Sequence, residues 1–462
     1  MDARHLVVCF ASVLYAATAW AQNWSNSGGN AARNCQSSEI GPDANDPLWS
    51  GAPSSIISWN PAIDGDRVFS VRQTSFPPES TGSPIVAFNI DTGQVLWTRH
   101  IPAVSGDWST WVVGARDNRV YASRAGNGAS VSSPMLCLDA SNGQTIWSTA
   151  PVTIDAGPYD GANFAPNGDI IICSFRTIKR FRAIDGTLAW SAPRLGSVSG
   201  NCGGAVLGDA IYVADAAFGG TVVKRYNLTT GAFQYQSPVL VGFTIQSSPF
   251  ASPDGTIYLA RTQNNVNTDF FYALNDTGTA LTTRWSIPCQ WSTSGEFGVG
   301  PDNTVYMMAP GGMLTRLNPA NGAVVNSYGP IAADFLSPHF AIDSAGKVFF
   351  SNGAFSNGML YSFDANLALR WTLSVPNANI GGPALGRDGT LIMSGSGTNL
   401  RAIRTPRCLA DFNRDGVLDF FDYLDFVDAF ASNLASSDFN GDGIIDFFDY
   451  LDFVDAFSRG CN

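Results

Sequence analysis

The sequence predicts an all-β protein, an eight-bladed β-propeller, followed by a small all-α C-terminal domain of two loop-helix repeats. The first observation is a strand-turn-strand unit that recurs about eight times between residues 46 and 405. The second is composition: only 14% of the 462 residues are charged and 47 are glycine, which favours a β-rich chain with many tight turns. The third is a separate duplication within residues 408–462.

The N-terminus has the pattern of a secretory signal peptide. Arg4 and His5 precede an apolar run over residues 6–20, and Ala19-Trp20-Ala21 is a small-x-small cleavage sequence. We therefore expect residues 1–21 to be removed and the protein to be secreted, extracellular or at the cell surface. A buried first strand or an anchor helix is the alternative. No later run reaches about 18 uninterrupted apolar residues, so no membrane span is expected. Residues 22–45 form an N-terminal segment outside the repeats.

Each repeated unit has two halves, and together they fit one four-stranded blade at intervals of roughly 43–50 residues. The first half is a strand, a turn of the Asp-Gly type and a β-branched strand, as in NPAIDGDRVFSV (60–71) and FASPDGTIYLAR (250–261). The second half is a strand, a Thr-Gly or Asn-Gly turn and a strand that ends in Trp, as in IVAFNIDTGQVLW (85–97). The glycine supplies the positive φ of the turn. The recurring tryptophans are expected to pack between neighbouring blades: Trp97, Trp147, Trp190, Trp285 and Trp371.

The eighth unit is incomplete, because the chain reaches Pro406 without a second turn or a Trp strand. The missing strand is found at the other end of the repeats, where residues 46–55 carry Leu48-Trp49. We expect this strand to pair within the blade that contains residues 384–404. Such pairing closes the ring and removes its open sheet edges.

The repeats of residues 46–405 resemble the pyrrolo-quinoline-quinone (PQQ) type, whose consensus runs DGxVY…LYALDxxTGxxxW. The resemblance implies an eight-bladed propeller but not the quinone, since many members of that superfamily bind none. Quinone-dependent dehydrogenases of the family carry an adjacent-cysteine pair, and no two cysteines are adjacent here. PQQ is therefore not expected, and a quinoprotein dehydrogenase is the third of three functional hypotheses.

The strongest chemical signal lies in the C-terminal duplication. Residues 411–432 and 438–459 align at an offset of 27 with 17 identities in 22, and each begins D-x-N-x-D-G-x-x-D-x-x-D. Calcium requires six to eight oxygen ligands around a tight loop, which this spacing supplies. The first predicted ligand set is Asp411, Asn413, Asp415, the Val417 carbonyl, Asp419 and Asp422. The second is Asp438, Asn440, Asp442, the Ile444 carbonyl, Asp446 and Asp449. Two calcium ions are therefore expected; two solvated Asp-rich turns are the alternative.

The negative charge is concentrated in the same segment. Residues 408–462 hold 12 Asp and 2 Arg, a net charge of −10 out of −12 for the chain. The carboxylates of each loop would repel one another without a cation. No basic surface remains that could neutralise phosphates, so nucleic-acid binding is excluded.

A duplicated calcium loop followed by a single helix, with Asp at position 12, resembles a dockerin. The resemblance covers residues 408–462 and implies attachment to a cohesin-like or other cell-surface protein, in a setting of polysaccharide degradation. Dockerins often recognise partners through small hydroxyl residues at loop positions 10 and 11, whereas this chain has Phe420-Phe421 and Phe447-Phe448. These phenylalanines are predicted to contact the partner; a place in the core is the alternative.

Seven cysteines remain after removal of the signal peptide. Cys408 and Cys461 flank the duplicated loops and are predicted to form a disulfide across the ends of the small domain. The sequence leaves the pairing of the others open: Cys35, Cys137, Cys173, Cys202 and Cys289.

The sequence assigns no catalytic residue. His100 and His339 fit satisfied blade residues, although His339 could serve a Ser-His-Asp site. Glu296 is one of only three glutamates, and a glycosidase would need a second carboxylate beside it. Three tryptophans could stack on sugar rings or pack between blades: Trp108, Trp111 and Trp291. The first hypothesis is thus a non-catalytic propeller that binds a carbohydrate or protein ligand and carries a calcium-dependent attachment module. A glycan-active enzyme that hydrolyses O-glycosyl bonds is the second.

Overall fold

A computed structural model describes most of the chain. Residues 1–23 lie outside the described part, and the predicted signal peptide is among them. The described residues are 24–51, 55, 60–126, 132–150, 154–155, 162–174, 176–195, 203–242, 248–263, 266–290, 296–334, 336–378, 381–395, 399–405, 408–413, 417–440 and 444–460. The chain divides into two compact units, Met1–Arg404 and Thr405–Asn462.

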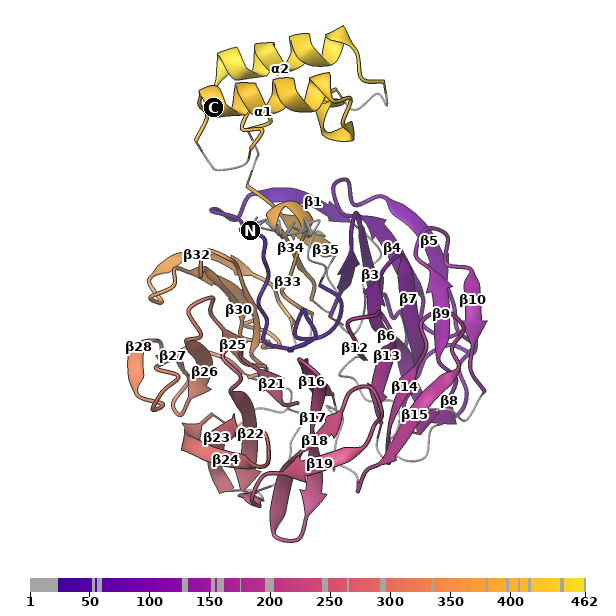
Figure 1. Ribbon diagram of the computed structural model, residues 1–462, viewed down its shortest axis with the longest axis vertical. Coiled ribbons are helices and arrows are strands. Elements are labelled where there is room, and N and C mark those ends of the chain that lie inside the picture. The colour runs from indigo at the N-terminus through magenta and orange to yellow at the C-terminus, as the bar shows by residue number, and fades with distance from the viewer. Residues whose placement is uncertain are drawn as a thin grey trace, which may run out of the picture. The chain divides into compact units, whose positions relative to one another are not determined.

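The first unit is a ring of eight four-stranded sheets, which confirms the predicted fold (Figure 1). Each sheet is an antiparallel meander with its first strand toward the centre of the ring. Blade 1 consists of β2 (Ala62–Asp64), β3 (Arg67–Val71), β4 (Ile85–Asn89) and β5 (Val95–Arg99), and blade 2 of β6 (Asp107–Arg116), β7 (Arg119–Gly126), β9 (Leu136–Asp139) and β10 (Thr145–Ser148). Blade 3 consists of β12 (Asn163–Phe164), β13 (Ile170–Cys173), β14 (Thr177–Phe181) and β15 (Leu188–Pro193), and blade 4 of β16 (Gly204–Leu207), β17 (Ala210–Ala217), β18 (Gly220–Asn227) and β19 (Phe233–Gln236).

The remaining blades follow in chain order, except that the last one takes its outer strand from the N-terminal end. Blade 5 consists of β21 (Phe250–Ala251), β22 (Ile257–Gln263), β23 (Val266–Asp276) and β24 (Leu281–Cys289), and blade 6 of β25 (Gly298–Val299), β26 (Val305–Ala309), β27 (Met313–Leu317) and β28 (Val324–Tyr328). Blade 7 consists of β29 (His339–Ile342), β30 (Val348–Ser351), β31 (Met359–Phe363) and β32 (Leu369–Ser374), and blade 8 of β33 (Ala384–Gly386), β34 (Thr390–Met393), β35 (Leu400–Ile403) and β1 (Pro47–Gly51). Two short additions are β8 (Ser132–Ser133) paired with β11 (Ile154–Asp155), and β20 (Leu240–Val241) paired with β18.

Strand β1 closes the ring as predicted. It pairs antiparallel with β35, with Trp49 opposite Ala402 and Gly51 opposite Leu400. The last blade is thus assembled from both ends of the propeller sequence, and the two ends are held together by a ladder of backbone hydrogen bonds.

Tryptophans of the outer strands join neighbouring blades, which confirms their predicted place. The indole Nε1 of Trp97 donates to the Ala140 carbonyl of the next blade at 2.8 Å. The same contact recurs from Trp147 to Ala183 (2.9 Å), Trp190 to Leu228 (3.0 Å), Trp285 to Pro319 (2.9 Å) and Trp49 to Ile90 (2.8 Å). Each indole also covers the glycine of the next blade's turn. A Cβ on Gly93, which has φ +69°, would lie 2.6 Å from the Trp49 ring, so both the turn and the packing require glycine there.

Trp371 of blade 7 is the exception. Blade 8 has lost the turn that would offer an acceptor, and the buried Nε1 of Trp371 has no hydrogen-bond partner within the described residues. Where the turn is missing from the repeat, the hydrogen bond of the preceding blade's tryptophan is missing as well.

The N-terminal segment lies at the centre of the ring, a position that no sequence pattern predicts (Figure 1). Its backbone carbonyls accept hydrogen bonds from inner-strand N–H groups of six blades. These are Ile63 to Trp24, Ala115 to Ser25, Val206 to Ala31, Ala251 to Ala32, Val299 to Asn34 and Ile342 to Cys35, all at 2.7–3.0 Å. The segment thus satisfies donors that would otherwise face the centre of the ring unpaired.

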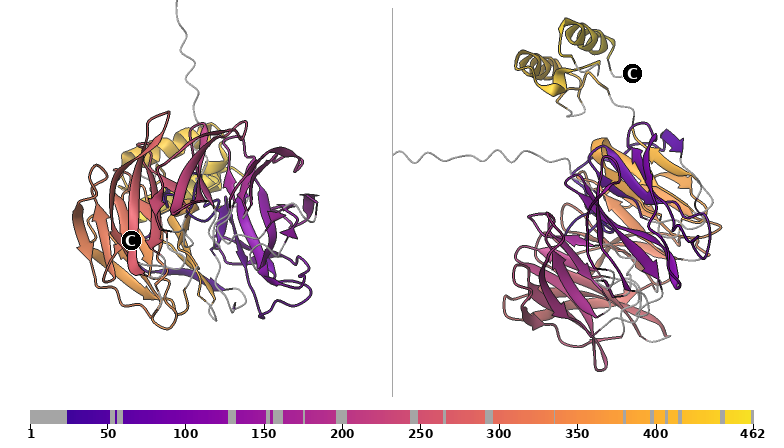
Figure 2. Two further views of the ribbon diagram at one scale, coloured as in Figure 1. Left: turned by 90° about the horizontal axis from the view of Figure 1, so that it is seen from below. Right: turned by 90° about the vertical axis from the view of Figure 1, so that its right-hand side faces the viewer.

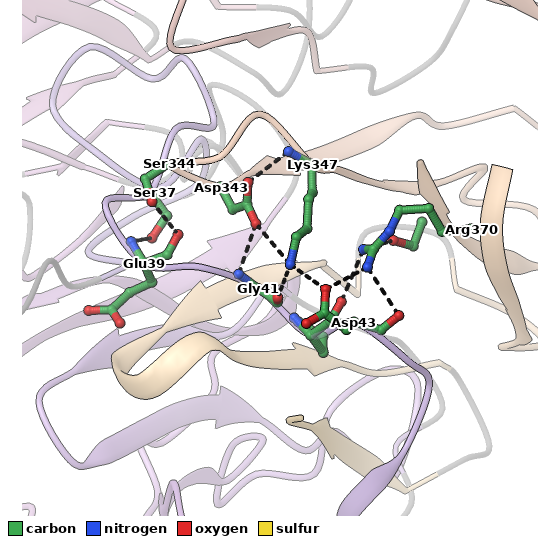
Figure 3. Close-up of polar contacts among 10 residues, drawn as sticks. Ser37, Glu39, Gly41, Asp43, Asp343, Ser344, Lys347 and Arg370 are labelled. Atoms are coloured by element: carbon green, nitrogen blue, oxygen red, sulfur yellow. Dashed lines mark hydrogen bonds and ion pairs between the residues drawn. The ribbon is translucent and has the colours of Figure 1, made fainter. Parts of the chain in front are cut away.

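Beyond the part that lies at the centre of the ring, the N-terminal segment is bound to blade 7 by hydrogen bonds and ion pairs, which Figure 3 shows. Oδ1 of Asp43 accepts from Lys347 and from Arg370, each at 2.6 Å. The Gly41 N–H donates to Asp343, and the Ser344 N–H donates to the Glu39 carbonyl. These contacts guide the chain from the centre of the ring to β1.

The second unit contains α1 (Phe420–Ala431), a short 3-10 turn η3 (Ala435–Ser437) and α2 (Phe447–Arg459). The two helices lie side by side (Figures 1 and 2). Phe426 and Phe453 are fully buried and stack with their ring centroids 3.9 Å apart. Phe412 and Phe439 meet this pair edge-on, so four aromatic rings pack together between the helices and loops of this unit. No helix in the described part of the chain is long and apolar enough to cross a membrane.

Candidate functional site

Both predicted calcium loops fold back onto the carboxylate at position 12. Asp419 caps α1 by accepting from the Phe421 N–H, and Asp422 accepts from the Asp419 N–H at 2.9 Å. The other oxygen of Asp422 accepts from the Asn413 N–H at 3.0 Å. The first loop therefore wraps around a side chain that is fully buried.

The second loop repeats this arrangement. Asp449 accepts from Asp446, Phe439 and Asn440 backbone N–H groups at 2.7–3.1 Å. These hydrogen bonds, that of Asp446 first, hold the pKa of Asp449 below its usual range. The same geometry at two sites shows that the duplicated sequence encodes a duplicated loop.

The donor set of each loop consists of oxygen atoms only, which suits a hard cation such as calcium. Positions 5 and 6 of both loops lie outside the described residues: Asp415, Gly416, Asp442 and Gly443. Within the described part of the chain, no three Asp, Glu, His or Cys side chains gather at metal-binding distance. The ligand sets therefore stay predictions; the residues that would hold the ions are those that the loop pattern names.

The four phenylalanines at loop positions 10 and 11 are exposed. Phe420 and Phe421 are 64% and 65% exposed, and Phe447 and Phe448 are 63% and 66% exposed. The helical period directs Asp422 and Phe426 to the interior instead. A place in the core, the alternative for these rings, is thus excluded, and they are available to a partner.

Cys408 is disulfide-bonded. Its predicted partner, Cys461, lies outside the described residues, as does Cys202. The other cysteines within the described residues are buried: Cys35, Cys137, Cys173 and Cys289.

A buried polar cluster near the centre of the ring joins two residues that the sequence analysis considered separately. His339 Nδ1 lies 3.2 Å from Glu296 Oε2, within ion-pair distance. Ser27 of the N-terminal segment donates to Glu296 Oε1 at 2.7 Å, and Cys35 Sγ lies 3.7 Å from Oε2. Glu296 therefore anchors the segment to blades 6 and 7.

The charges within this cluster follow from its contacts. Burial opposes ionisation of Glu296, but electrostatic attraction to His339 and the hydrogen bond from Ser27 outweigh it and hold the pKa of Glu296 below its ordinary value. Burial, together with the Glu296 charge, raises the pKa of the Cys35 thiol well above its ordinary value. Cys35 is thus a neutral thiol in a structural position.

The chemistry available to this cluster is limited by access. Ser337 Oγ lies 3.4 Å from His339 Nε2, which places Ser, His and Glu in sequence, yet Ser337 is fully buried. The Glu296 carboxylate is engaged by His339, Ser27 and Cys35.

The two candidates for sugar stacking that the structure describes, Trp108 and Trp111, are half-buried and buried. Trp111 is only 3% exposed and packs against Tyr121 and Phe164 in the core between blades 2 and 3. Trp108 is half-buried, and Trp291 lies outside the described residues. His100 contacts the Gly82 carbonyl at 3.0 Å.

The fold and its repeats define a PQQ-type propeller. A sequence profile of the family described as outer membrane protein assembly factor BamB matches residues 81–328. Because this match spans more than half of the 462 residues, the chain belongs to that family. No curated protein matches the sequence significantly.

Solved structures share the fold at low sequence identity. BamB from Moraxella catarrhalis is 13% identical with a TM-score of 0.55, over 78% of this chain and 99% of that one. A europium-containing methanol dehydrogenase is 10% identical with a TM-score of 0.57, over 82% and 90%. Quinohemoprotein alcohol dehydrogenase from Comamonas testosteroni is 11% identical with a TM-score of 0.57, over 84% and 82%. The propeller is thus shared by an outer membrane protein assembly factor and by dehydrogenases, and the likeness shows the fold alone.

Proposed function

We propose that the protein is a secreted, non-catalytic propeller that holds a protein or carbohydrate ligand and attaches to a cohesin-like or other cell-surface protein through a calcium-dependent, dockerin-like module. The observation that carries the proposal is the pair of matched loops. Each loop closes on the carboxylate at position 12 and leaves the phenylalanines at positions 10 and 11 in solvent.

Charge supports calcium as the ion. The segment 408–462 has a net charge of −10, and each loop concentrates four aspartates and one asparagine within 12 residues. Two divalent cations would cancel much of the repulsion, so calcium binding and folding of this unit are coupled. Residues 1–21 act as the signal peptide that brings the chain to a compartment where calcium reaches about 10⁻⁴–10⁻³ M.

The architecture of the propeller supports a scaffold role rather than catalysis. The chain's own N-terminal segment bonds to the inner strands of six blades, and its Ser27 and Cys35 contact Glu296. The family's description as an assembly factor fits a propeller that binds other proteins. The resemblance of residues 408–462 to a dockerin favours a setting of polysaccharide degradation.

The attachment is tested by retention on the full chain, immobilised in about 1 mM calcium, of cell-surface proteins from the source organism. We expect one or more proteins to be retained, released by chelator and lost from a Phe420→Ser/Phe447→Ser variant. A variant at Phe233, an exposed phenylalanine of the propeller, is the matched control and should retain them. Retention that is unchanged by chelator and by the double variant would contradict the proposal.

A further inference from the structure

The exposed aromatic rings of the C-terminal unit form one row rather than two separate patches. Phe420 stacks on Tyr423 with ring centroids 5.9 Å apart and an interplanar angle of 16°. Phe447 stacks on Tyr450 in the same way, at 5.8 Å and 17°. The two tyrosine hydroxyls lie 2.9 Å apart and share a hydrogen bond. The row therefore runs Phe420, Tyr423, Tyr450, Phe447 across both helices.

The row has an internal two-fold symmetry. The residues that correspond between the two helices, Phe420 with Phe447 and Tyr423 with Tyr450, are 27 apart in the sequence, and so are Phe426 and Phe453 of the buried stack. Tyr423 near the start of α1 meets Phe457 near the end of α2, and Tyr450 meets Phe430 in return, so the helices are antiparallel. A two-fold axis that relates antiparallel helices is normal to their plane. Phe420 and Phe447 consequently lie at opposite ends of the same face.

Apolar exposure continues beyond the row along each helix. Leu424 follows Phe420 by one turn and is 45% exposed, and Leu451 follows Phe447 and is also 45% exposed. One turn further on, each stripe ends in an exposed aspartate, Asp428 or Asp455. The face is thus an apolar stripe across two helices with acidic ends.

The negative charge of the C-terminal unit determines what kind of partner this face attracts. The segment 408–462 has no lysine and two arginines against 12 aspartates, and two calcium ions would still leave it near −6. Arg459 already pairs with Asp455 of its own helix. A second copy of the same unit would bring like charges together, whereas a surface with lysine or arginine beside apolar residues would be attracted.

We infer that the whole row is a single docking face, occupied by one partner protein whose apolar contact surface is bordered by lysine or arginine. The inference rests on the proposed attachment function and adds that both repeats bind at once. Phe421 and Phe448 each follow a phenylalanine of the row by one residue, so the helical period turns them off the line of stacked rings, and we expect them to contribute less.

The test uses the full chain in about 1 mM calcium and two probes, an amphipathic helical peptide of about 14 residues with leucine on one face and lysine on the other, and its leucine-glutamate counterpart. Calorimetry should show one leucine-lysine peptide per chain and at least about tenfold weaker binding of the glutamate peptide. Phe420→Ser and Phe447→Ser should each weaken binding at least about tenfold. The matched Phe421→Ser and Phe448→Ser variants should weaken it by less than about threefold, and added salt should weaken it in all cases.

Several outcomes would overturn the inference. Two peptides per chain, with each Phe variant removing one, would show two separate sites. Equal binding of both peptides would remove the charge argument, and failure of both to bind while calcium still binds would remove the docking face alone. Dimerisation of the chain that depends on Phe420 and Phe447, seen by light scattering, would assign the face to a second copy. Absence of calcium binding would instead contradict the proposed function itself.

Discussion

The indole Nε1 of Trp49 donates to the carbonyl of Ile90 at 2.8 Å and so joins the last blade to the first. Trp49 comes from the N-terminal strand that pairs with β35, and Ile90 stands at the turn of blade 1. The contact that four other tryptophans make within the series is made here by a strand from the opposite end of the repeats. Ring closure therefore depends on a hydrogen-bonded ladder and on this indole.

We predict that Trp49→Phe lowers the free energy of unfolding by about 1–2 kcal/mol, because the buried Ile90 carbonyl loses its donor. Trp371→Phe is the matched control: it removes an indole N–H that has no acceptor within the described residues, so it should cost less or stabilise. Chemical denaturation of both variants measures the difference. An equal loss at the two sites would show that the indole hydrogen bond contributes nothing to closure.

Deletion of residues 22–52 should lower the melting temperature sharply and open the ring. The deletion removes the acceptors for six inner strands, the polar contacts with blade 7 and the outer strand of blade 8 at once. Scanning calorimetry and hydrogen exchange at β35 measure the effect. A melting curve like that of the intact chain would show that the ring closes without its N-terminal segment.

The Glu296–His339 contact predicts a pH-dependent stability. The pKa of Glu296 in the folded protein is below its ordinary value of 4.5, so its contribution is present above that value and is lost as pH falls through the folded pKa. Glu296→Gln should therefore destabilise the protein by about 1–3 kcal/mol at pH 7 and make no difference at the lowest pH at which the chain stays folded. Denaturation at a series of pH values compares the two proteins. A constant difference at all pH values would show that the lost contact is not charge-dependent.

We predict that Cys408 forms its disulfide with Cys461, which closes a loop of about 50 residues. In the chain-entropy account such a bridge stabilises by roughly 4 kcal/mol, so Cys461→Ser should loosen the C-terminal helices and leave the propeller transition unchanged. Peptide mapping under non-reducing conditions identifies the pair. Recovery of Cys408 linked to another cysteine would refute the assignment.

The periodic parts of the molecule are visible in the sequence because each blade repeats the same turn glycine and the same outer-strand side chain. Even the missing strand at Leu48-Trp49 could be assigned, since it restores the pattern. The N-terminal segment could not, because it bonds through backbone carbonyls such as those of Trp24 and Ala31, which leave no residue pattern. Glu296 and His339 are 43 residues apart in the sequence, and only the packing of adjacent blades brings them into contact.

In the C-terminal unit, too, some features could be predicted from the sequence and others could not. The loop motif predicts where Asp419 and Asp422 act, because cap and ligand positions are fixed relative to the helix start. The sequence left the phenylalanines between core and surface, because aromatic residues at positions 420, 421, 423 and 426 offer the helix more than one apolar face. Packing of Phe426 on Phe453 selects the buried face and leaves Phe420 and Phe447 outside.

The central claim is that residues 408–462 bind calcium in two loops. Calorimetric titration of the full chain with calcium tests it most directly, with Asp411→Ala and Asp438→Ala as single-site variants and Asp46→Ala, an acidic residue of the propeller, as the control. We predict two ions for the intact chain and the control, one for each single variant and none for the pair, with dissociation constants at or below about 10⁻⁴–10⁻³ M. An intact chain that shows no calcium heat, or variants that bind as many ions as the intact chain, would contradict the account.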